Sequence, residues 1–343
     1  MIIKYIAKKY QATEHIKIYL LLGLIVLALM FFFIAKAYDR INSSSPVIFG
    51  VTFSPDYAKT LGFDPKKIYQ QMFQDLKIKK IRLLAYWDTL EPKPNEFDFK
   101  DLDFYVDWAT LNNAQVILAI GYKLPRWPEC RVPDWLKNKG MKIRQERQLI
   151  YLQAIISRYE NNKTISAWQI ENEPLFSFGE CDPVDELFLN KEVAFVRNLS
   201  NKPILLTDSG ELSSWITPMR LSDYFGTTMY RTVYNPVVGW LPYPLQPWYY
   251  RIKSDVIRTF LAPQNKKTIT IELQAEPWAE DFIADKPIKE QLEHFTVQDV
   301  QDNINFAKKV GTPEIYLWGV EWWYWIKTQG HPEFLDYAKQ IIR

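Results

Sequence analysis

The sequence predicts a parallel (β/α)8 barrel, the TIM-barrel form of the α/β class, preceded by one transmembrane helix. Short apolar runs alternate with amphipathic stretches from residue 47 onward, and this alternation is typical of parallel strands covered by helices. Eight such units use almost all of the 343-residue chain, which is long enough for one closed barrel. An open doubly wound sheet is the alternative, but no glycine-rich phosphate turn follows the first predicted strand.

The predicted strands are bounded by residues that favour turns or begin amphipathic helices. In chain order they are Val47–Phe53, Lys80–Tyr86, Gln115–Gly121, Ile165–Glu171, Pro203–Asp208, Phe225–Tyr230, Thr268–Leu273 and Glu314–Trp318. Helices are expected near residues 65–75, 102–112, 144–160, 183–199 and 332–342.

A proline- and aromatic-rich insertion, Tyr234–Tyr250, follows the sixth predicted strand. Long connections in compact domains are usually functional or disordered, and the aromatic content of this one argues against disorder. We interpret it as a wall of a substrate cleft. Structural packing and contact with a nearby bilayer are the alternatives.

Residues 18–35 form an apolar stretch without a charged side chain, bounded by Lys17 and Lys36. A helix of this length spans about 27 Å, close to the hydrocarbon thickness of a bilayer. Lysines precede the stretch, so the positive-inside rule predicts that residues 1–17 are cytoplasmic. We therefore expect a transmembrane signal-anchor helix at 18–35.

A membrane anchor at this position would hold the rest of the chain outside the cytoplasm. Residues 36–46 then form a linker, and residues 47–343 form the extracytoplasmic barrel. Ala35–Ala37 resembles a signal-peptidase cleavage site, so removal of the segment and secretion of the barrel is the alternative.

The two cysteines, Cys130 and Cys181, fit an exported domain. Both are predicted on loops that leave neighbouring strands at the same rim of the barrel. We therefore predict a disulfide between them, and two unpaired thiols are the alternative.

Composition excludes some classes of function. The net charge is +2 and no basic stripe with interleaved aromatics is present, so nucleic-acid binding has no support. No spacing of His, Cys and Asp matches a metal site, and we expect neither a metal nor another cofactor. Aromatic residues make up 15% of the chain, which is well suited to stacking on flat ligand faces.

An amide and two carboxylates stand where the fourth predicted strand ends. The run Trp168–Pro174 reads Trp-Gln-Ile-Glu-Asn-Glu-Pro. Pro174 has no N–H to donate to a neighbouring strand, and it favours an extended backbone at Glu173. Strand ends of this kind form the active-site face of a barrel. Because alternate strand side chains face opposite sides of a sheet, we expect Glu171 to point away from the cleft.

The seventh predicted strand supplies a second carboxylate, Glu272, near its end. The fourth and seventh strands face each other obliquely across the barrel mouth, so Glu173 and Glu272 can reach one ligand. Glycoside hydrolysis needs such a pair, with a protonated acid for the leaving oxygen and a carboxylate for the anomeric carbon. Glu276, in the loop that follows Glu272, is the rival carboxylate.

These residues resemble glycoside hydrolase clan A, whose barrels carry glutamates at the ends of strands four and seven. Asn172-Glu173-Pro174 matches the signature of that clan, and the resemblance implies that Glu173 is the acid/base and Glu272 the nucleophile. It also implies that Asn172 bonds the sugar 2-hydroxyl. Arg82 matches the strand-two arginine that would hold Glu272 ionised.

The resemblance extends to three aromatic residues. Tyr230 matches the strand-six tyrosine beside the nucleophile, and Trp318 matches the strand-eight aromatic beneath the sugar. Trp87 opens the stretch Trp87–Pro92, which is similar to family 42 β-galactosidases and relatives in families 5 and 39, and we expect it to bind substrate.

The expected protein is a membrane-anchored retaining β-glycosidase that hydrolyses O-glycosidic bonds of oligo- or polysaccharides by double displacement. Its expected partners are the carbohydrate substrate and, through the N-terminal helix, the membrane. A transglycosidase acting through the same site and a non-catalytic polysaccharide-binding barrel are the alternatives. The presence of Glu173, Glu272 and Arg82 together argues against the binding barrel.

Overall fold

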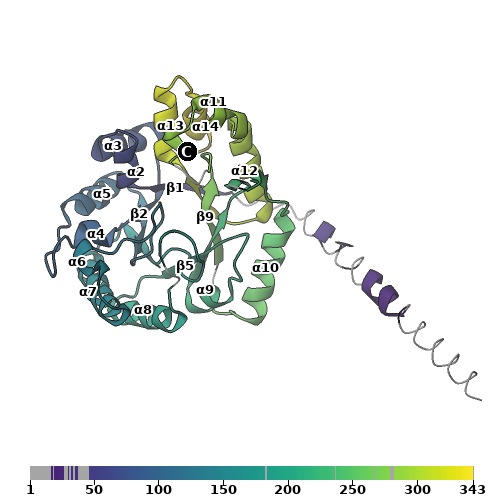
Figure 1. Cartoon of the computed structure of the whole chain (residues 1–343), viewed down its shortest axis with the longest axis horizontal. Helices are drawn as coiled ribbons and strands as arrows, with labels where there is room; N and C mark the ends of the chain where they lie inside the picture. The colour runs from purple at the N-terminus through teal and green to yellow at the C-terminus, as the bar shows by residue number, and fades with distance from the viewer. Residues whose placement is uncertain are drawn as a thin grey trace, which may run out of the picture.

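Eight parallel strands close into a barrel, and helices form a ring around it (Figure 1). The computed structural model describes residues 17, 19–26, 30, 32–33, 35–37, 46–181, 184–235, 237–265, 267–278 and 282–342. The strand order around the barrel is β1-β10-β9-β6-β5-β4-β3-β2. The strands are β1 (Ile48–Phe53), β2 (Lys80–Leu84), β3 (Gln115–Ile120), β4 (Ile165–Ile170), β5 (Ile204–Asp208), β6 (Tyr224–Met229), β9 (Lys267–Gln274) and β10 (Glu314–Trp318).

Helices join the strands and cover the outer face of the barrel (Figure 1). Those before β5 are α2 (Pro55–Thr60), α3 (Pro65–Leu76), α4 (Trp87–Leu90), α5 (Lys100–Leu111), α6 (Asp134–Lys137), α7 (Met141–Tyr159) and α8 (Glu186–Leu199). Those after β5 are α9 (Ile216–Leu221), α10 (Pro247–Phe260), the 3-10 turn η1 (Ile283–Asp285), α11 (Ile288–His294), α12 (Val297–Val310), α13 (Val320–Thr328) and α14 (Glu333–Ile341).

The prediction of a closed barrel is confirmed, and each predicted strand overlaps an observed strand. The open-sheet alternative is wrong, because β1 pairs in parallel with both β2 and β10. The pairing of the first strand with the last removes both sheet edges. The surrounding helices cover the outer face of the barrel, so most strand residues are buried.

The interior of the barrel changes from apolar to polar along the strands. Ala167 on β4 and Leu205 on β5 belong to one buried cluster with Ile117, Ile269, Ile271 and Tyr316 from other strands. Side chains from strands this far apart around the barrel can meet only inside it. Two residues farther along, Gln169 and Thr207 face the same side and are also fully buried. This polar layer lies towards the carboxyl ends of the strands.

Local sequence signals set the ends of several helices. Asp64 caps α3 by accepting hydrogen bonds from the backbone of Lys66 and Lys67, and Pro65 occupies the first turn. Thr296 and Asp299 form a reciprocal capping box at the start of α12. The sequence therefore encodes these helix boundaries independently of the barrel.

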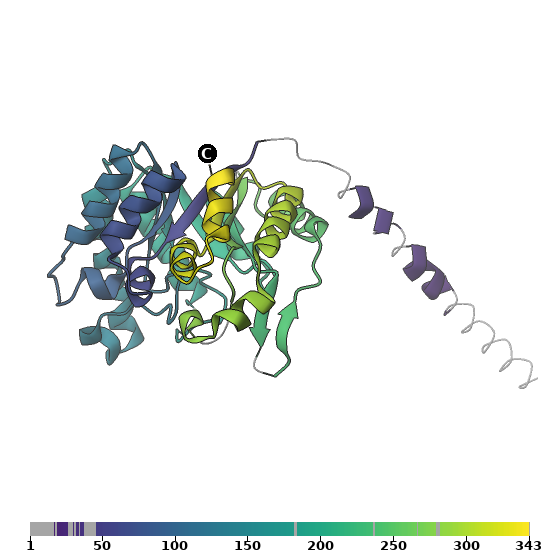
Figure 2. The ribbon, with the colours of Figure 1, turned by 90° about the horizontal axis from the view of Figure 1, so that it is seen from above.

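The predicted insertion Tyr234–Tyr250 is not one irregular loop. It contains most of an antiparallel hairpin, β7 (Thr232–Asn235) and β8 (Gly239–Pro242), and then the first turn of α10. The hairpin projects from the barrel (green in Figure 2) and follows β6, so it rises beside the mouth. Trp240 stacks on His294 of α11 with ring centroids 4.8 Å apart, which attaches the hairpin to the neighbouring helix.

The predicted transmembrane segment, residues 18–35, lies partly outside the described residues. Residues 19–26 are helical, stand away from the barrel (Figure 1), and expose apolar side chains such as Tyr19 and Leu20. Within the described part of the chain, no helix is both long and apolar enough to cross a bilayer. The anchor stays a prediction, as does the cytoplasmic segment, of which only Lys17 is described.

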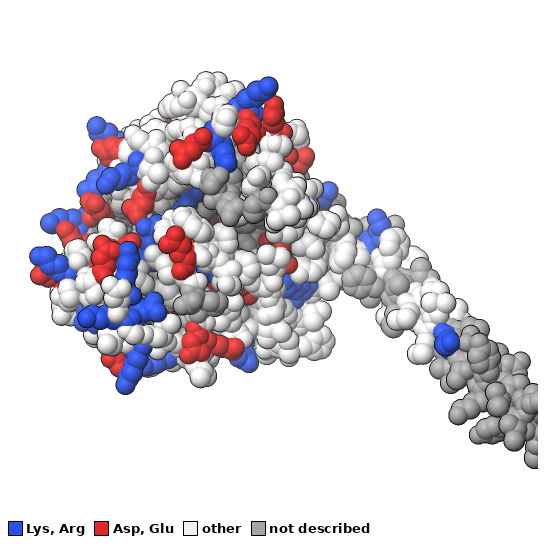
Figure 3. Space-filling model, in the orientation of Figure 1, with Lys and Arg blue, Asp and Glu red and all other residues white. Residues whose placement is uncertain are grey.

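Charged side chains are distributed over the barrel without a patch of one sign on the face in view. Lysine and arginine are interspersed with aspartate and glutamate there (Figure 3). A mixed surface of this kind produces no large field that would steer a charged polymer to that face.

We predict that Thr296→Ala lowers the free energy of unfolding by about 1 kcal/mol, because it removes the hydroxyl that caps α12. Urea denaturation of the purified chain measures the change. Asn305→Ala is the matched control on an exposed position of the same helix, and it should change stability by less than about 0.5 kcal/mol. Equal effects of the two substitutions would contradict the capping role.

Candidate active site

The middle of β2 and the carboxyl ends of β4, β6 and β9 bring together the predicted site residues. Arg82 donates to Glu272 Oε1 from Nη1 at 2.6 Å and to Asn172 Oδ1 from Nη2 at 2.8 Å. Tyr230 donates its hydroxyl to Glu272 Oε2 at 2.9 Å. Glu173 follows Asn172 directly, so both predicted carboxylates belong to one cluster at the barrel mouth.

Arg82 is the centre of this cluster and is fully buried. Its third group, Nε, donates to Gln169 Oε1 at 2.7 Å. Planar guanidinium donors with three different acceptors fix the relative positions of those acceptors. Arg82 therefore ties β2 to β4 and β9 at the level where the predicted catalytic side chains begin.

An irregularity in β9 turns Glu272 towards the interior. Along β9, Thr270 pairs with Thr227 of β6, but Glu272 pairs with the next residue, Thr228. Ile271 is thus the extra residue of a bulge, and its side chain lies in the interior cluster. By strict alternation Glu272 would face away from Ile271, whereas the bulge lets both face inward.

The expected extended conformation of Glu173 is wrong: its backbone is left-handed, with φ at 44°. Its N–H donates to Thr207 Oγ1 at 2.9 Å, and Thr228 Oγ1 donates to Glu173 Oε1 at 3.1 Å. A non-glycine residue in this region is strained and persists only where surrounding bonds hold it. The strand ends of β5 and β6 thus hold both the backbone and the carboxyl of Glu173.

The environment of Glu173 favours its protonated form. Burial raises its pKa well above the usual carboxyl value, and the negative charges of Glu272 and Glu129 raise it further. The ammonium of Lys123 acts in the opposite direction but is outweighed. A carboxyl group with a raised pKa, close to a second one that accepts from Arg82 and Tyr230, is the pairing that suits general-acid and nucleophilic chemistry.

The loop after β3 contributes charged residues that the sequence interpretation did not include. Lys123 is fully buried and donates to the carbonyl of Glu173 at 3.0 Å and of Phe176 at 2.8 Å. Glu129 lies 3.3 Å from Lys123 and accepts from Asn172 Nδ2 at 3.3 Å. The sequence offered one signal for these residues, the high density of charged side chains in residues 123–131. A loop with this composition is normally solvated, so the signal did not indicate buried site residues.

A disulfide joins Cys130 to Cys181, as the sequence predicted, and ties the loop after β3 to the loop after β4. A backbone bridge between Lys123 and Cys130 closes the base of the first loop. The loop that carries Glu129 is therefore held at two points.

Trp318, the predicted sugar platform at the end of β10, is covered on one face by Arg126. The guanidinium carbon of Arg126 lies 4.0 Å from the Trp318 ring centroid and 3.6 Å from that of Tyr57. Arg126 also pairs with Glu276 and, at 3.2 Å, with Glu321. The rival carboxylate Glu276 is thus paired with Arg126, whereas Arg82 and Tyr230 bond Glu272.

Trp87, which we expected to bind substrate, does not face the site. Its side chain is fully buried, stacks on Tyr151, and donates from Nε1 to Glu91 at 2.7 Å. It is therefore a core residue. Glu171 also lies outside the cleft, where it accepts from the backbone N–H groups of Tyr122 and Lys123.

Aromatic side chains border the mouth next to Glu173, and we refer to Trp127, Phe176, Phe178 and Trp278 as the aromatic rim. Phe178 lies at its centre, with ring centroids 6.2 Å from Trp127, 6.3 Å from Phe176 and 6.1 Å from Trp278. Trp127 is 61% exposed. The rim gathers the loops after β3, β4 and β9, and it presents apolar surface to whatever enters the mouth.

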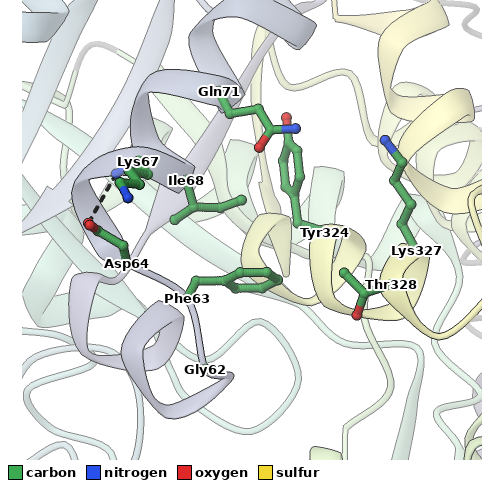
Figure 4. A pocket seen from close by; sticks show the side chains of 9 residues that line it. All are labelled: Gly62, Phe63, Asp64, Lys67, Ile68, Gln71, Tyr324, Lys327 and Thr328. Carbon is green, nitrogen blue, oxygen red and sulfur yellow. Dashed lines mark hydrogen bonds between the residues drawn. The ribbon is translucent and has the colours of Figure 1, made fainter.

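A separate hollow of about 350 Å³ lies outside the barrel, between α3 and α13 (Figure 4). Phe63, Ile68 and Tyr324 form its apolar part. Among the described residues that line it, Asp64 is the one carboxylate, and it caps α3. The hollow therefore lacks a carboxylate pair. No group of three or more His, Cys, Asp or Glu in the described part of the chain is arranged to hold a metal ion.

Comparison with known proteins finds glycoside hydrolases. A model of glycosyl hydrolase family 5 (cellulase) matches residues 43–270. The chain is 28% identical to β-galactosidase BgaA of Clostridium cellulovorans over 173 residues. This aligned region covers 42% of this chain and 25% of that protein. It is 29% identical to mannan endo-1,4-β-mannosidase A of Emericella nidulans over 83 residues. This aligned region covers 24% of this chain and 20% of that protein.

The chain thus spans a quarter or less of the length of these two relatives, at 25% and 20%. Among solved structures, an exo-β-1,4-mannosidase from Opitutaceae bacterium strain TAV5 has a TM-score of 0.58 at 15% identity. That likeness covers 87% of this chain and 59% of the mannosidase chain. At so low an identity it shows a shared fold.

We predict that Glu173 titrates well above the usual carboxyl range and that Glu272→Gln lowers its pKa, because the substitution removes a neighbouring negative charge. Carbon-13 NMR of labelled glutamate side chains measures both values. Glu314→Gln is the control, since Glu314 begins β10 at the other end of the barrel and pairs with Lys267. A pKa of Glu173 that stays constant or rises in Glu272→Gln would contradict the coupling.

Proposed function

Since this chain belongs to glycosyl hydrolase family 5, we propose that it is a retaining β-glycosidase acting on oligo- or polysaccharides outside the cytoplasm. One observation carries the proposal: Glu272 accepts from Arg82 and Tyr230, while burial and the nearby charge of Glu272 raise the pKa of Glu173. Double displacement requires two carboxyl groups beside one anomeric carbon, one that donates a proton and one that attacks as a nucleophile.

In the first step, the Glu173 carboxyl transfers its proton to the glycosidic oxygen. The bond between that oxygen and the anomeric carbon breaks, and a Glu272 oxygen bonds to the anomeric carbon from the opposite side. The leaving alcohol departs with the proton. Tyr230 and Arg82 hold the Glu272 carboxylate in the orientation from which it attacks.

In the second step, the Glu173 carboxylate accepts a proton from a water molecule. The water oxygen bonds to the anomeric carbon as the bond to Glu272 breaks, which returns both side chains to their starting forms. Two inversions leave the anomeric configuration of the product the same as that of the substrate. Thr228 donates to Glu173 and so steadies the carboxyl that serves as acid and then as base.

The aromatic rim supports a carbohydrate as the substrate. Its rings come from the loops that border Glu173, and Phe176 N–H donates to the Glu173 carbonyl at 3.0 Å. Apolar ring faces suit the C–H faces of pyranose sugars. The relatives that the chain resembles include enzymes named for β-galactoside and β-mannan substrates, which supports a β-glycosidic bond as the target.

Membrane attachment is the part of the proposal that concerns location. Residues 18–35 carry no charge, and described members of the stretch, such as Leu24 and Phe33, are exposed at 64% and 67%. Chain entry into β1 defines the amino end of the barrel, opposite the mouth.

We predict that Glu272→Gln lowers kcat/KM on an aryl β-glycoside by about 10⁴-fold or more, because no nucleophile remains. Glu173→Gln should lose about 10²- to 10⁴-fold on poor leaving groups and far less on glycosyl fluorides, which need no proton. Steady-state kinetics on a panel of aryl β-glycosides measures both effects.

Glu276→Gln is the matched control for the nucleophile, because it makes the same change at the rival carboxylate two residues after the end of β9. Labelling by a 2-fluoro sugar followed by peptide mass spectrometry identifies the attacked residue directly. Wild-type turnover by Glu272→Gln, or a label on Glu276, would overturn the assignment. A wild-type chain that cleaves no glycoside on the panel would overturn the proposed function.

We predict that removing residues 1–46 moves the protein from the membrane fraction to the soluble fraction without changing its kcat/KM, because the barrel begins at Ile48. Cell fractionation and activity of the two forms measure this. Full-length Glu272→Gln is the control, which should fractionate with the membrane. Recovery of the intact full-length chain in the soluble fraction would contradict the anchor.

A further inference from the structure

One buried carboxylate beside the catalytic pair has no part in the proposed mechanism. Glu129 lies in the loop after β3 and is 5% exposed. Its backbone is left-handed, with φ at 65°, as is that of Glu173. Backbone strain at a buried acid next to a reacting pair is typical of residues held in place for a functional purpose.

The position of Glu129 relative to the substrate follows from Asn172. Arg82 bonds both Glu272 and the Oδ1 atom of Asn172, so the Asn172 amide lies next to the attacking carboxylate. With Oδ1 facing Arg82, the Nδ2 group points the other way and donates to Glu129 Oε1 at 3.3 Å. A sugar whose anomeric carbon is within reach of Glu272 therefore has its adjacent ring hydroxyls near Asn172 and Glu129.

The hydrogen bonds of Glu129 are incomplete. Its Oε2 atom pairs with the Lys123 ammonium at 3.3 Å but forms no hydrogen bond with any described residue. Lys123 already donates to the carbonyl groups of Glu173 and Phe176. Protein atoms enclose Oε2, so the remaining acceptor capacity lies on Oε1, which accepts one bond from Asn172 at 3.3 Å. A carboxylate oxygen has two lone pairs, and a ligand hydroxyl can donate to the second.

We propose that Glu129 is a third functional carboxylate of this site, which accepts a hydrogen bond from a ring hydroxyl of the sugar held between Glu173 and Glu272. The inference rests on the proposed function and adds a residue that selects among sugars. Recognition of a hydroxyl by a buried charged acceptor discriminates strongly against a sugar that lacks the hydroxyl, because the acceptor is then left unpaired. A purely structural partner for Lys123 would show no such discrimination.

The test compares the wild-type chain with Glu129→Gln on an aryl β-glycoside and on its monodeoxy analogues. On the parent glycoside, the loss of the charged acceptor should lower kcat/KM by about 10-fold or more. On the analogue without the contacted hydroxyl, wild type and variant should agree within about 2-fold. The two changes, Glu129→Gln in the protein and the missing hydroxyl in the substrate, form a cycle that isolates the contact between the side chain and that hydroxyl.

Glu180→Gln is the matched control, since it makes the same chemical change on an exposed carboxylate one residue before Cys181. It should leave kcat/KM unchanged on every substrate. If Glu129→Gln unfolds because Lys123 loses its ion-pair partner, Glu129→Asp is the second variant. It keeps a negative charge near Lys123, but its side chain is one methylene shorter, so the carboxylate lies farther from the sugar. The Asp variant should show the same dependence on the deoxy analogues.

An equal loss on the parent and on every deoxy analogue would overturn the inference, because Glu129 would then act only through the structure. An unchanged kcat/KM on all substrates in the folded variant would overturn it as well. These outcomes differ from failure of the proposed function, in which the wild-type chain cleaves no glycoside and the inference falls with it.

Discussion

The buried guanidinium of Arg82 is the constraint on which the rest of the site depends. A cation removed from water is costly unless it is paired and hydrogen-bonded, and here each of the three guanidinium nitrogens donates to one acceptor, on Gln169, Asn172 or Glu272. These acceptors come from β4, its following loop and β9, so the barrel must close with these strands in register before Arg82 is satisfied. The same contacts that make the burial of Arg82 tolerable also align the residues that meet the sugar.

The loop after β3 is the second determinant of the site. Its charged residues are not solvated: Lys123 holds the loop that carries Glu173, and Arg126 is enclosed by Tyr57, Trp318 and two carboxylates. Arg126 and Glu129 share the left-handed backbone of Glu173, with φ at 79° and 65°. Strain of this kind needs compensation, which the disulfide to the loop after β4 and the ion pairs supply.

The strand-end residues of the site could be predicted from sequence because short apolar runs locate parallel strands and their ends. Glu173, Glu272, Arg82 and Tyr230 follow from that rule and from the clan resemblance, and the structure brings them together. Trp87 shows the limit of the rule. It also follows a strand, yet its ring turns into the core against Tyr151. Side-chain direction at a strand end depends on the packing of the neighbouring helix, which strand periodicity does not report.

The sequence by itself determined the barrel, the order of its strands along the chain and the identity of the acids at their ends, because periodicity and helix caps are local properties. Only the tertiary structure decided which acids cooperate. The bulge at Ile271 turns Glu272 inward, and Arg126 engages Glu276 instead. Glu129 gains a place beside Asn172 although it lies 43 residues away. Such pairings depend on how distant loops fold over one another, and no pattern within a single segment encodes them.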